Sequence, residues 1–246
     1  GLMREASRKL VSEDAEIFGQ QLDRALKAID QALLTKSEAL LDKPLSDTEK
    51  KGFHDLLKAA GYHPAMLSAL TQGESARNLL TLAGDAQPGA MTSELQEALQ
   101  NLMLEHPTLD GAVKAYALQH TDSPKEMEAQ LESLATRRDV MTALKTHFSE
   151  KALATLGLEG KAVSVDTLQT LMNQADTKRG LKAMDLTLLK ALWGARQLEG
   201  QSFDDFRATL PESLSSLPNL ESLLSTGIES RAQFEAIGRD LTGLSK

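Results

Sequence analysis

The sequence contains no cysteine and few aromatic residues. Its 246 residues include one Trp, two Tyr and six Phe, and aromatic residues make up only 4% of the chain. The absence of cysteine excludes disulfides, thiolate catalysis and cysteine-ligated zinc. With so few aromatic rings, Leu, Ala and Met must fill the interior, as is common where helices pack closely on helices. The sequence therefore has few side chains that could stack against nucleic-acid bases or sugars in a deep pocket.

Signals for membrane spanning and for nucleic-acid binding are also missing. No run of about 18 apolar residues occurs, so we expect no membrane span. The formal net charge is −8, and Lys and Arg are scattered among Asp and Glu along the sequence. Such a chain is repelled by phosphate backbones and by anionic membrane surfaces. We therefore expect neither nucleic acid nor a membrane as its partner.

What is present is apolar spacing of the helical period almost throughout the chain. Start signals recur: Ser46-Asp47-Thr48-Glu49 reads as a capping box, and Ser123-Pro124-Lys125-Glu126 is typical of a helix start. No stretch alternates apolar and polar residues for long enough to form a strand. The sequence predicts an all-α fold of about 12 helices that begins with a long helix from about Ser12 to Leu41.

The chain reads as a single helical domain over residues 1–246. The stretch that most favours a subdivision is Gly84–Met91, because Gly and Pro gather there, and Gly84 also reads as a helix stop signal. Farther along, the pattern predicts separate helices near 124–135 and 138–155.

The long first helix carries apolar residues at heptad spacing. Charged residues flank them, and the candidate dimer seam consists of Phe18, Leu22, Leu26, Ile29, Leu33 and Leu40. Two interpretations stay open: the helix lies across the domain with this face inward, or it pairs two chains as a short coiled coil.

Catalytic and metal-binding signatures are missing from the sequence. The five His residues form no HExxH arrangement, and Gly84-x-x-x-x-Gly89 lacks the Lys and Ser/Thr that a phosphate-binding loop requires. Asp204 and Asp205 form a carboxylate pair, but they fall in the first turn of an expected helix, where negative charge favours the helix dipole. We therefore predict a chain that is not an enzyme and that has no cofactor and no metal site.

Trp193 is the single tryptophan, and it follows several Leu residues on an expected helix. A tryptophan in that setting is either part of the core or the anchor of a binding surface, because Trp is favoured at interface hot spots.

In size and layout the chain resembles one known family. The heptad helix described above, followed by many short capped helices, is similar to the C-terminal helical domain of the Vibrio actin-nucleating effectors VopL and VopF. The resemblance is one of overall layout and not of a motif. The actin-binding segments of that family end in an LKKT-like tail, to which Leu33-Leu34-Thr35-Lys36 is the nearest and a poor match. The resemblance implies a homodimer with host actin as its protein partner, in an effector that a bacterium secretes into host cells.

The leading hypothesis is a non-catalytic protein-interaction and dimerisation domain that holds actin subunits for filament nucleation. Its mechanism would be geometric, since two copies would place their partners at filament spacing. The alternatives are an effector acting on a host small GTPase or on a ubiquitin pathway, and a secretion chaperone or gatekeeper. An enzyme with a site assembled from scattered residues comes last. Without secretion, the expected location is the cytoplasm.

Overall fold

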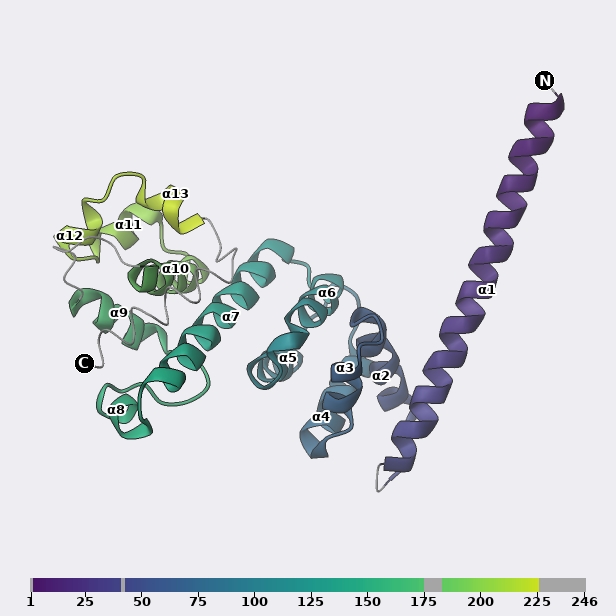
Figure 1. The fold of residues 1–246 in the computed structure, drawn as a ribbon, viewed down its shortest axis with the longest axis horizontal. Helices are drawn as coiled ribbons and strands as arrows, with labels where there is room; N and C mark the ends of the chain where they lie inside the picture. Colours follow the sequence, from purple (N-terminus) through teal and green to yellow (C-terminus); the bar gives the residue numbers. More distant parts are fainter. Residues whose placement is uncertain (1, 41–42, 175–182, 226–246) are drawn as a thin grey trace. The chain divides into compact units, whose positions relative to one another are not determined.

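All regular structure that we describe is helical. The computed structural model describes residues 2–40, 43–174 and 183–225, and it contains helices but no β-strand in these ranges (Figure 1). The prediction of an all-α fold is therefore confirmed. The chain divides into two compact units, Gly1–Gln87 (unit 1) and Pro88–Lys246 (unit 2). This division falls within the stretch 84–91 where Gly and Pro gather.

Unit 1 holds the first four helices. They are α1 (Leu2–Leu40), α2 (Asp47–Ala59), α3 (Pro64–Leu70) and α4 (Gly73–Asp85). The start of α2 forms as predicted: the Ser46 side chain accepts a hydrogen bond from the Glu49 backbone N–H, and the Ser46 backbone N–H donates to Glu49 Oε1. The start of α1 is ten residues earlier than predicted.

Helices α2 and α4 pack closely because each has a glycine at their contact. A Cβ added at Gly52 would overlap the carbonyl oxygen of Leu80, and one added at Gly84 would overlap that of Thr48. Gly84, which its sequence pattern indicated as a helix stop signal, lies one residue before the end of α4 and is also the point where the α2 backbone approaches. The core of unit 1 forms beside this contact, from side chains that include Phe53, Leu56, Leu57, Leu79 and Leu80.

Arg77 of α4 holds the segment that follows α1. Its guanidinium donates to the backbone oxygens of Lys43 and Pro44 and to both carboxylate oxygens of Glu49, with Nε 2.9 Å from Glu49 Oε2. The Arg77 hydrogen bond is the main reason that the pKa of Glu49 falls from its ordinary value of 4.5 to about 2. The Arg77 side chain thereby joins the segment that follows α1, the N-terminal cap of α2 and helix α4.

Replacing Glu49 with glutamine is expected to lower the free energy of unfolding by about 1–3 kcal/mol near neutral pH, because hydrogen bonds to a charged group are lost. The folded-state pKa of Glu49 lies below its ordinary value, so this stabilisation is present above pH 4.5 and is lost as the pH falls towards about 2. Urea denaturation of both proteins near neutrality and at the lowest pH at which they stay folded measures the difference. A difference in the free energy of unfolding between the two proteins that does not change with pH would contradict the ion pair between Glu49 and Arg77.

Unit 2 holds the other helices that the structure describes. They are α5 (Ser93–Glu105), the 3-10 helix η1 (Pro107–Leu109), α6 (Asp110–His120), α7 (Pro124–His147), α8 (Glu150–Thr155), α9 (Val165–Gln174), α10 (Ala183–Leu198), α11 (Phe203–Ala208), α12 (Glu212–Ser215) and α13 (Leu220–Ser225). Helix α7 contacts α5, α6, α8 and α10. It therefore connects the early and late helices of unit 2.

The predicted break between residues 135 and 138 is wrong, because α7 runs through it without interruption. No Gly or Pro lies between Pro124 and His147, so the polar run Thr136–Asp139 is compatible with one continuous helix. The start of α7 also differs in detail. Ser123 occupies the N-cap position, but its side chain makes no capping bond and donates instead to Asp122.

The buried side chain of Arg138 explains how α7 continues through this polar run. It is only 3% exposed, and its two Nη atoms donate to the two carboxylate oxygens of Asp110, at 2.6 and 2.8 Å. Further bonds go to Asp139 Oδ1 and to the Met103 carbonyl oxygen. Burial raises the pKa of Asp139, and the adjacent guanidinium opposes that rise. This network links α5, α6 and α7.

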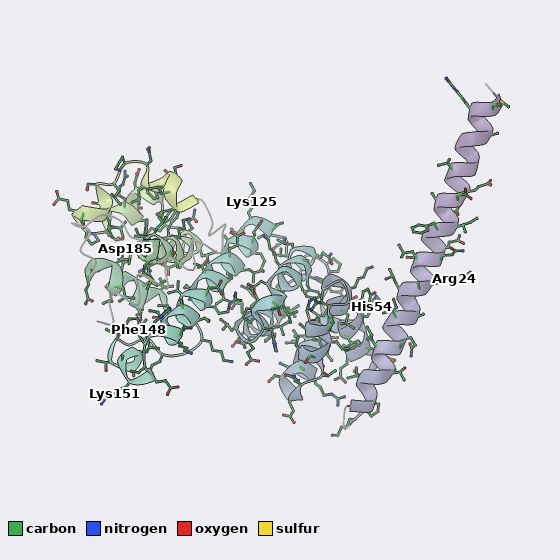
Figure 2. The ribbon with its side chains drawn as sticks, in the orientation of Figure 1. Arg24, His54, Lys125, Phe148, Lys151 and Asp185 are labelled. Atoms are coloured by element: carbon green, nitrogen blue, oxygen red, sulfur yellow. The ribbon has the colours of Figure 1, made fainter. Side chains whose placement is uncertain are left out.

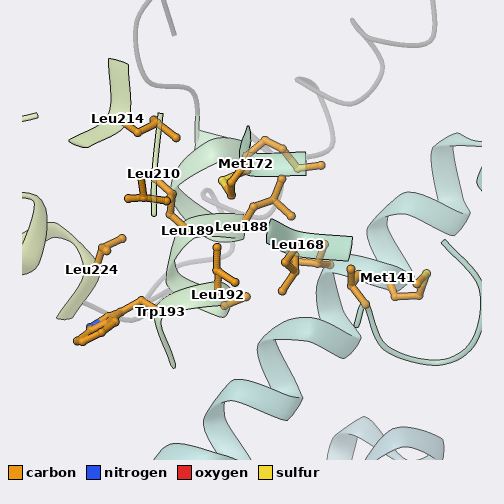
Figure 3. Packing of buried hydrophobic residues seen from close by; sticks show 14 of the residues in the cluster. Met141, Leu168, Met172, Leu188, Leu189, Leu192, Trp193, Leu210, Leu214 and Leu224 are labelled. Atoms are coloured by element: carbon orange, nitrogen blue, oxygen red, sulfur yellow. The ribbon is translucent and has the colours of Figure 1, made fainter. Parts of the chain in front are cut away.

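The second half of α7 and the helices after it enclose a large hydrophobic core. Figure 3 shows side chains of α7, α9, α10 and the C-terminal helices converging there, among them Met141, Leu168, Leu189, Leu192 and Leu214. Helix α10 lies at the centre of this core, because it contacts α7, α9, α11 and α13.

Candidate functional site

Helix α1 presents a continuous apolar face to solvent. The apolar residues that form it are spaced three or four apart in the sequence, so they lie on one side of the helix. We call this set the α1 face: Val11, Ala15, Phe18, Leu22, Leu26, Ile29 and Leu33. Phe18 is 66% exposed, Leu22 48% and Ile29 45%, while Leu26 and Leu33 are half-buried. Figure 2 shows side chains standing off α1 along its length. Of the predicted seam residues, only the side chain of Leu40 lies outside what the structure describes.

Helix α2 contacts a different side of α1. Lys27, Gln31 and Leu34 of α1 line a hollow of about 350 Å³ with Lys50, Phe53 and His54 of α2. At about 100° per residue, these three α1 residues lie between about 120° and 180° around the helix axis from Leu22. The α1 face therefore points away from α2.

The exposed large apolar residues that the structure describes are concentrated on α1. Six of the nine large apolar side chains that are exposed in the described residues belong to this helix, and none of its described side chains is buried. Most helices in proteins gain their stability from burial of an apolar face, and an isolated helix in water is marginal. Helix α1 thus has the sequence of an amphipathic helix, and in the part of the chain that the structure describes its apolar side remains largely exposed.

Val11 and Ala15 extend the face beyond the predicted seam by one heptad. Val11 is 68% exposed and lies seven residues before Phe18. That spacing was present in the sequence, but the expected helix began at Ser12 and so left Val11 out. Carboxylates lie on both flanks of the face: Glu16 and Asp23 on one side, and Asp14 on the other.

Trp193 lies in the core of unit 2. It is 7% exposed, and its ring stands edge-on to Phe203 at 5.2 Å and tilted to Phe206 at 5.0 Å between ring centres. The side chains of this chain therefore already cover most of the indole. Of the two interpretations that the sequence left open, this position corresponds to the core.

The polar candidates from the sequence occupy local structural positions. Asp204 and Asp205 lie in the first turn of α11, where the Asp205 backbone N–H donates to the Ser202 side chain. His63 Nδ1 accepts from the Ala65 backbone N–H at the start of α3. The His120 ring stacks on that of Tyr116. Within the described residues, no group of His, Asp and Glu side chains is placed to hold a metal ion.

Comparison with protein-family models, with curated proteins and with solved structures finds no match to this chain. Among the described helices, none combines the length and the apolar character needed to cross a membrane. The case for a function therefore depends on the α1 face.

Proposed function

We propose that this chain is a non-catalytic protein-interaction domain that self-associates through α1. The observation that carries the proposal is the α1 face, an exposed apolar stripe at heptad spacing on the side of the helix away from α2. An exposed apolar surface of this continuity is characteristic of an interaction site. A second amphipathic helix is the natural cover, because side chains at heptad spacing interlock with those of a like helix.

The free energy gained by covering this face is of the size that association requires. Full burial of a Phe, Leu or Ile side chain contributes about 1.5–3 kcal/mol, and partial burial contributes proportionally less. Phe18, Leu22 and Ile29 are each about half exposed or more. In a symmetric pair both copies bury the same residues, so each contribution counts twice. The sum for these three residues, about 5–10 kcal/mol, is of the same size as the loss of freedom on association, about 4–15 kcal/mol, and the other residues of the α1 face add to it.

Replacing Phe18, Leu22 or Ile29 singly with aspartate is expected to raise the dimer dissociation constant at least about a hundredfold, because burying a carboxylate in an apolar contact is costly. Sedimentation equilibrium of the whole chain measures this. The expected mass is that of two chains for the parent protein and one chain for each variant. Gln20→Asp, an exposed position on the far side of α1, is the matched control and is expected to remain a dimer.

Two results would count against the proposal. One is a parent chain that is monomeric throughout the accessible concentration range. The other is a control variant that dissociates as readily as the three face variants. Far-UV circular dichroism on each protein verifies that the helices of both units remain folded, so that loss of association is not confused with unfolding.

The partner that we propose beyond the second copy is host actin, held by a domain that a bacterium secretes into host cells. The support for this part is the resemblance in layout to the actin-nucleating effectors, together with a pairing helix that would place two copies of the domain together. Pyrene-actin assembly tests it: the parent chain is expected to shorten the lag before filament growth, and Leu22→Asp is expected to lose that effect. A dimer without any effect on actin assembly would turn attention to small GTPases, measured by nucleotide exchange.

A further inference from the structure

A hollow of about 470 Å³ lies beside α8, within unit 2. Its apolar lining includes Phe148, which follows α7 (Figure 2), and Leu153 and Leu158. Leu153 and Leu158 are each only 3% exposed and belong to the hydrophobic core, so they form the floor of the hollow. Pockets for small ligands commonly measure about 300–1,000 Å³ and have mostly apolar walls. This hollow therefore has the size and the floor of a small-ligand site.

The turn that follows α8 fixes the shape of the hollow. The Leu158 backbone N–H donates to the Leu153 carbonyl oxygen at 2.8 Å, as at many helix C-termini. Gly157 lies in this turn with a φ of 72°, a left-handed conformation that glycine adopts without strain. Farther along, Lys145 Nζ of α7 donates to the Gly160 carbonyl oxygen. Because these bonds form the walls in the absence of a ligand, a ligand that binds there orders little of the chain.

Charged groups of both signs line the same hollow. Lys145 contributes an ammonium group, and Glu150 and Glu159 contribute carboxylates. Within the described residues no ion pair joins Lys145 to either glutamate, and neither carboxylate has another ion-pair or hydrogen-bond partner. The ammonium group of Lys145 has three donors, of which Gly160 uses one. A ligand that carries both charges can therefore pair with groups that do not pair with each other.

We infer that this hollow binds a free apolar α-amino acid. The ammonium group of the ligand pairs with Glu150 or Glu159, its carboxylate pairs with Lys145, and its side chain lies on the apolar floor. An aromatic side chain gains further from the ring of Phe148, because aromatic pairs are favourable beyond their buried area. This site goes beyond the proposed self-association and does not depend on it, because all of its residues belong to unit 2.

Titration of the ¹⁵N-labelled full chain with L-phenylalanine tests the site. The backbone N–H signals of Glu159 and Gly160 are expected to shift with a dissociation constant of about 1 mM, since so small a ligand at an exposed rim gains little free energy. Two analogues share its ring: 2-phenylethylamine lacks the carboxylate, and 3-phenylpropionate lacks the ammonium group. Each is expected to bind about two- to fivefold more weakly, the usual effect of losing one exposed ion pair.

A variant that fills the hollow locates the ligand. Ala154 is exposed and lines the hollow, so Ala154→Phe is expected to raise the dissociation constant of L-phenylalanine at least about tenfold by occupying the space. Thr155→Phe is the matched control, because Thr155 is the next exposed residue of α8 but is not part of the lining. It is expected to bind as the parent chain does.

The carboxylates are tested by removing their charge. Glu150→Gln/Glu159→Gln is expected to raise the dissociation constant about two- to fivefold. Glu94→Gln/Glu97→Gln, at two exposed positions of α5, removes the same charge outside the hollow and is expected to have no effect. Circular dichroism verifies that every variant is folded.

Three results would overturn the inference: no shift at ligand concentrations well above the expected constant, equal binding of L-phenylalanine and both analogues, or undiminished binding by Ala154→Phe. None of them bears on self-association, which sedimentation of the parent chain measures separately.

Discussion

Replacing Gly52 with alanine is expected to destabilise unit 1 by about 3 kcal/mol, the upper end of the usual cost of overpacking. The added Cβ would overlap the carbonyl oxygen of Leu80 and crowd the backbone of α4. These are backbone atoms within a helix, so no side-chain rotation can relieve the overlap. The two helices must move apart, which loosens the packing of Phe53, Leu56 and Leu80 in the core. Gly84→Ala is expected to have a similar effect, since its Cβ would overlap the carbonyl oxygen of Thr48.

The control for this prediction is Gly111→Ala. Gly111 also lies in a helix, α6, but a Cβ there would meet no atom within 4 Å. Alanine is the better helix former by about 1 kcal/mol, so this variant is expected to be as stable as the parent chain or slightly more stable. Urea denaturation followed by circular dichroism compares the three proteins. Equal stability of Gly52→Ala and Gly111→Ala would show that α2 and α4 are not held at the close distance described.

The sequence predicts the helical class well because apolar periodicity and end signals are local properties. The Ser46 box forms as expected, since both of its hydrogen bonds lie within four residues. Gly84 indicated a helix end, and α4 does end one residue later, but the sequence could not show that another helix approaches this glycine. That approach depends on Thr48, a residue far along the chain. The break predicted in α7 failed for a similar reason: the partner that satisfies Arg138 is Asp110, in another helix.

The candidate site shows the same division between local and distant information. Heptad spacing placed Phe18, Leu22 and Ile29 on one side of a helix, and they do share that side. Spacing alone could not say whether the side is covered, because that depends on where α2 contacts α1. Trp193 illustrates the converse, since its burial depends on Phe203 and Phe206 in a later helix.

Replacing Arg138 with methionine is expected to destabilise unit 2 by about 3–5 kcal/mol near neutral pH, the usual cost of removing one partner from a buried ion pair. The change leaves Asp110 and Asp139 without their cation and leaves the Met103 carbonyl without a donor. Methionine fills much of the volume, so the loss is mainly electrostatic. Arg196→Met is the matched control in the same unit, because Arg196 pairs at the surface with Glu199 and is expected to contribute about 0–1 kcal/mol.

The pH dependence identifies the origin of that loss. Burial already raises the pKa of Asp139 above its ordinary value of 3.8, and removing the guanidinium that opposes the rise raises it further. A carboxyl whose pKa is raised on folding favours the folded state most at low pH and loses that advantage as the pH rises. The deficit of Arg138→Met is therefore expected to be smaller below pH 3.8 than near neutrality, and Arg138→Met/Asp139→Asn is expected to recover part of it at neutral pH. A deficit that is no larger than that of Arg196→Met, or that does not change with pH, would mean that the buried network does not hold α5, α6 and α7 together.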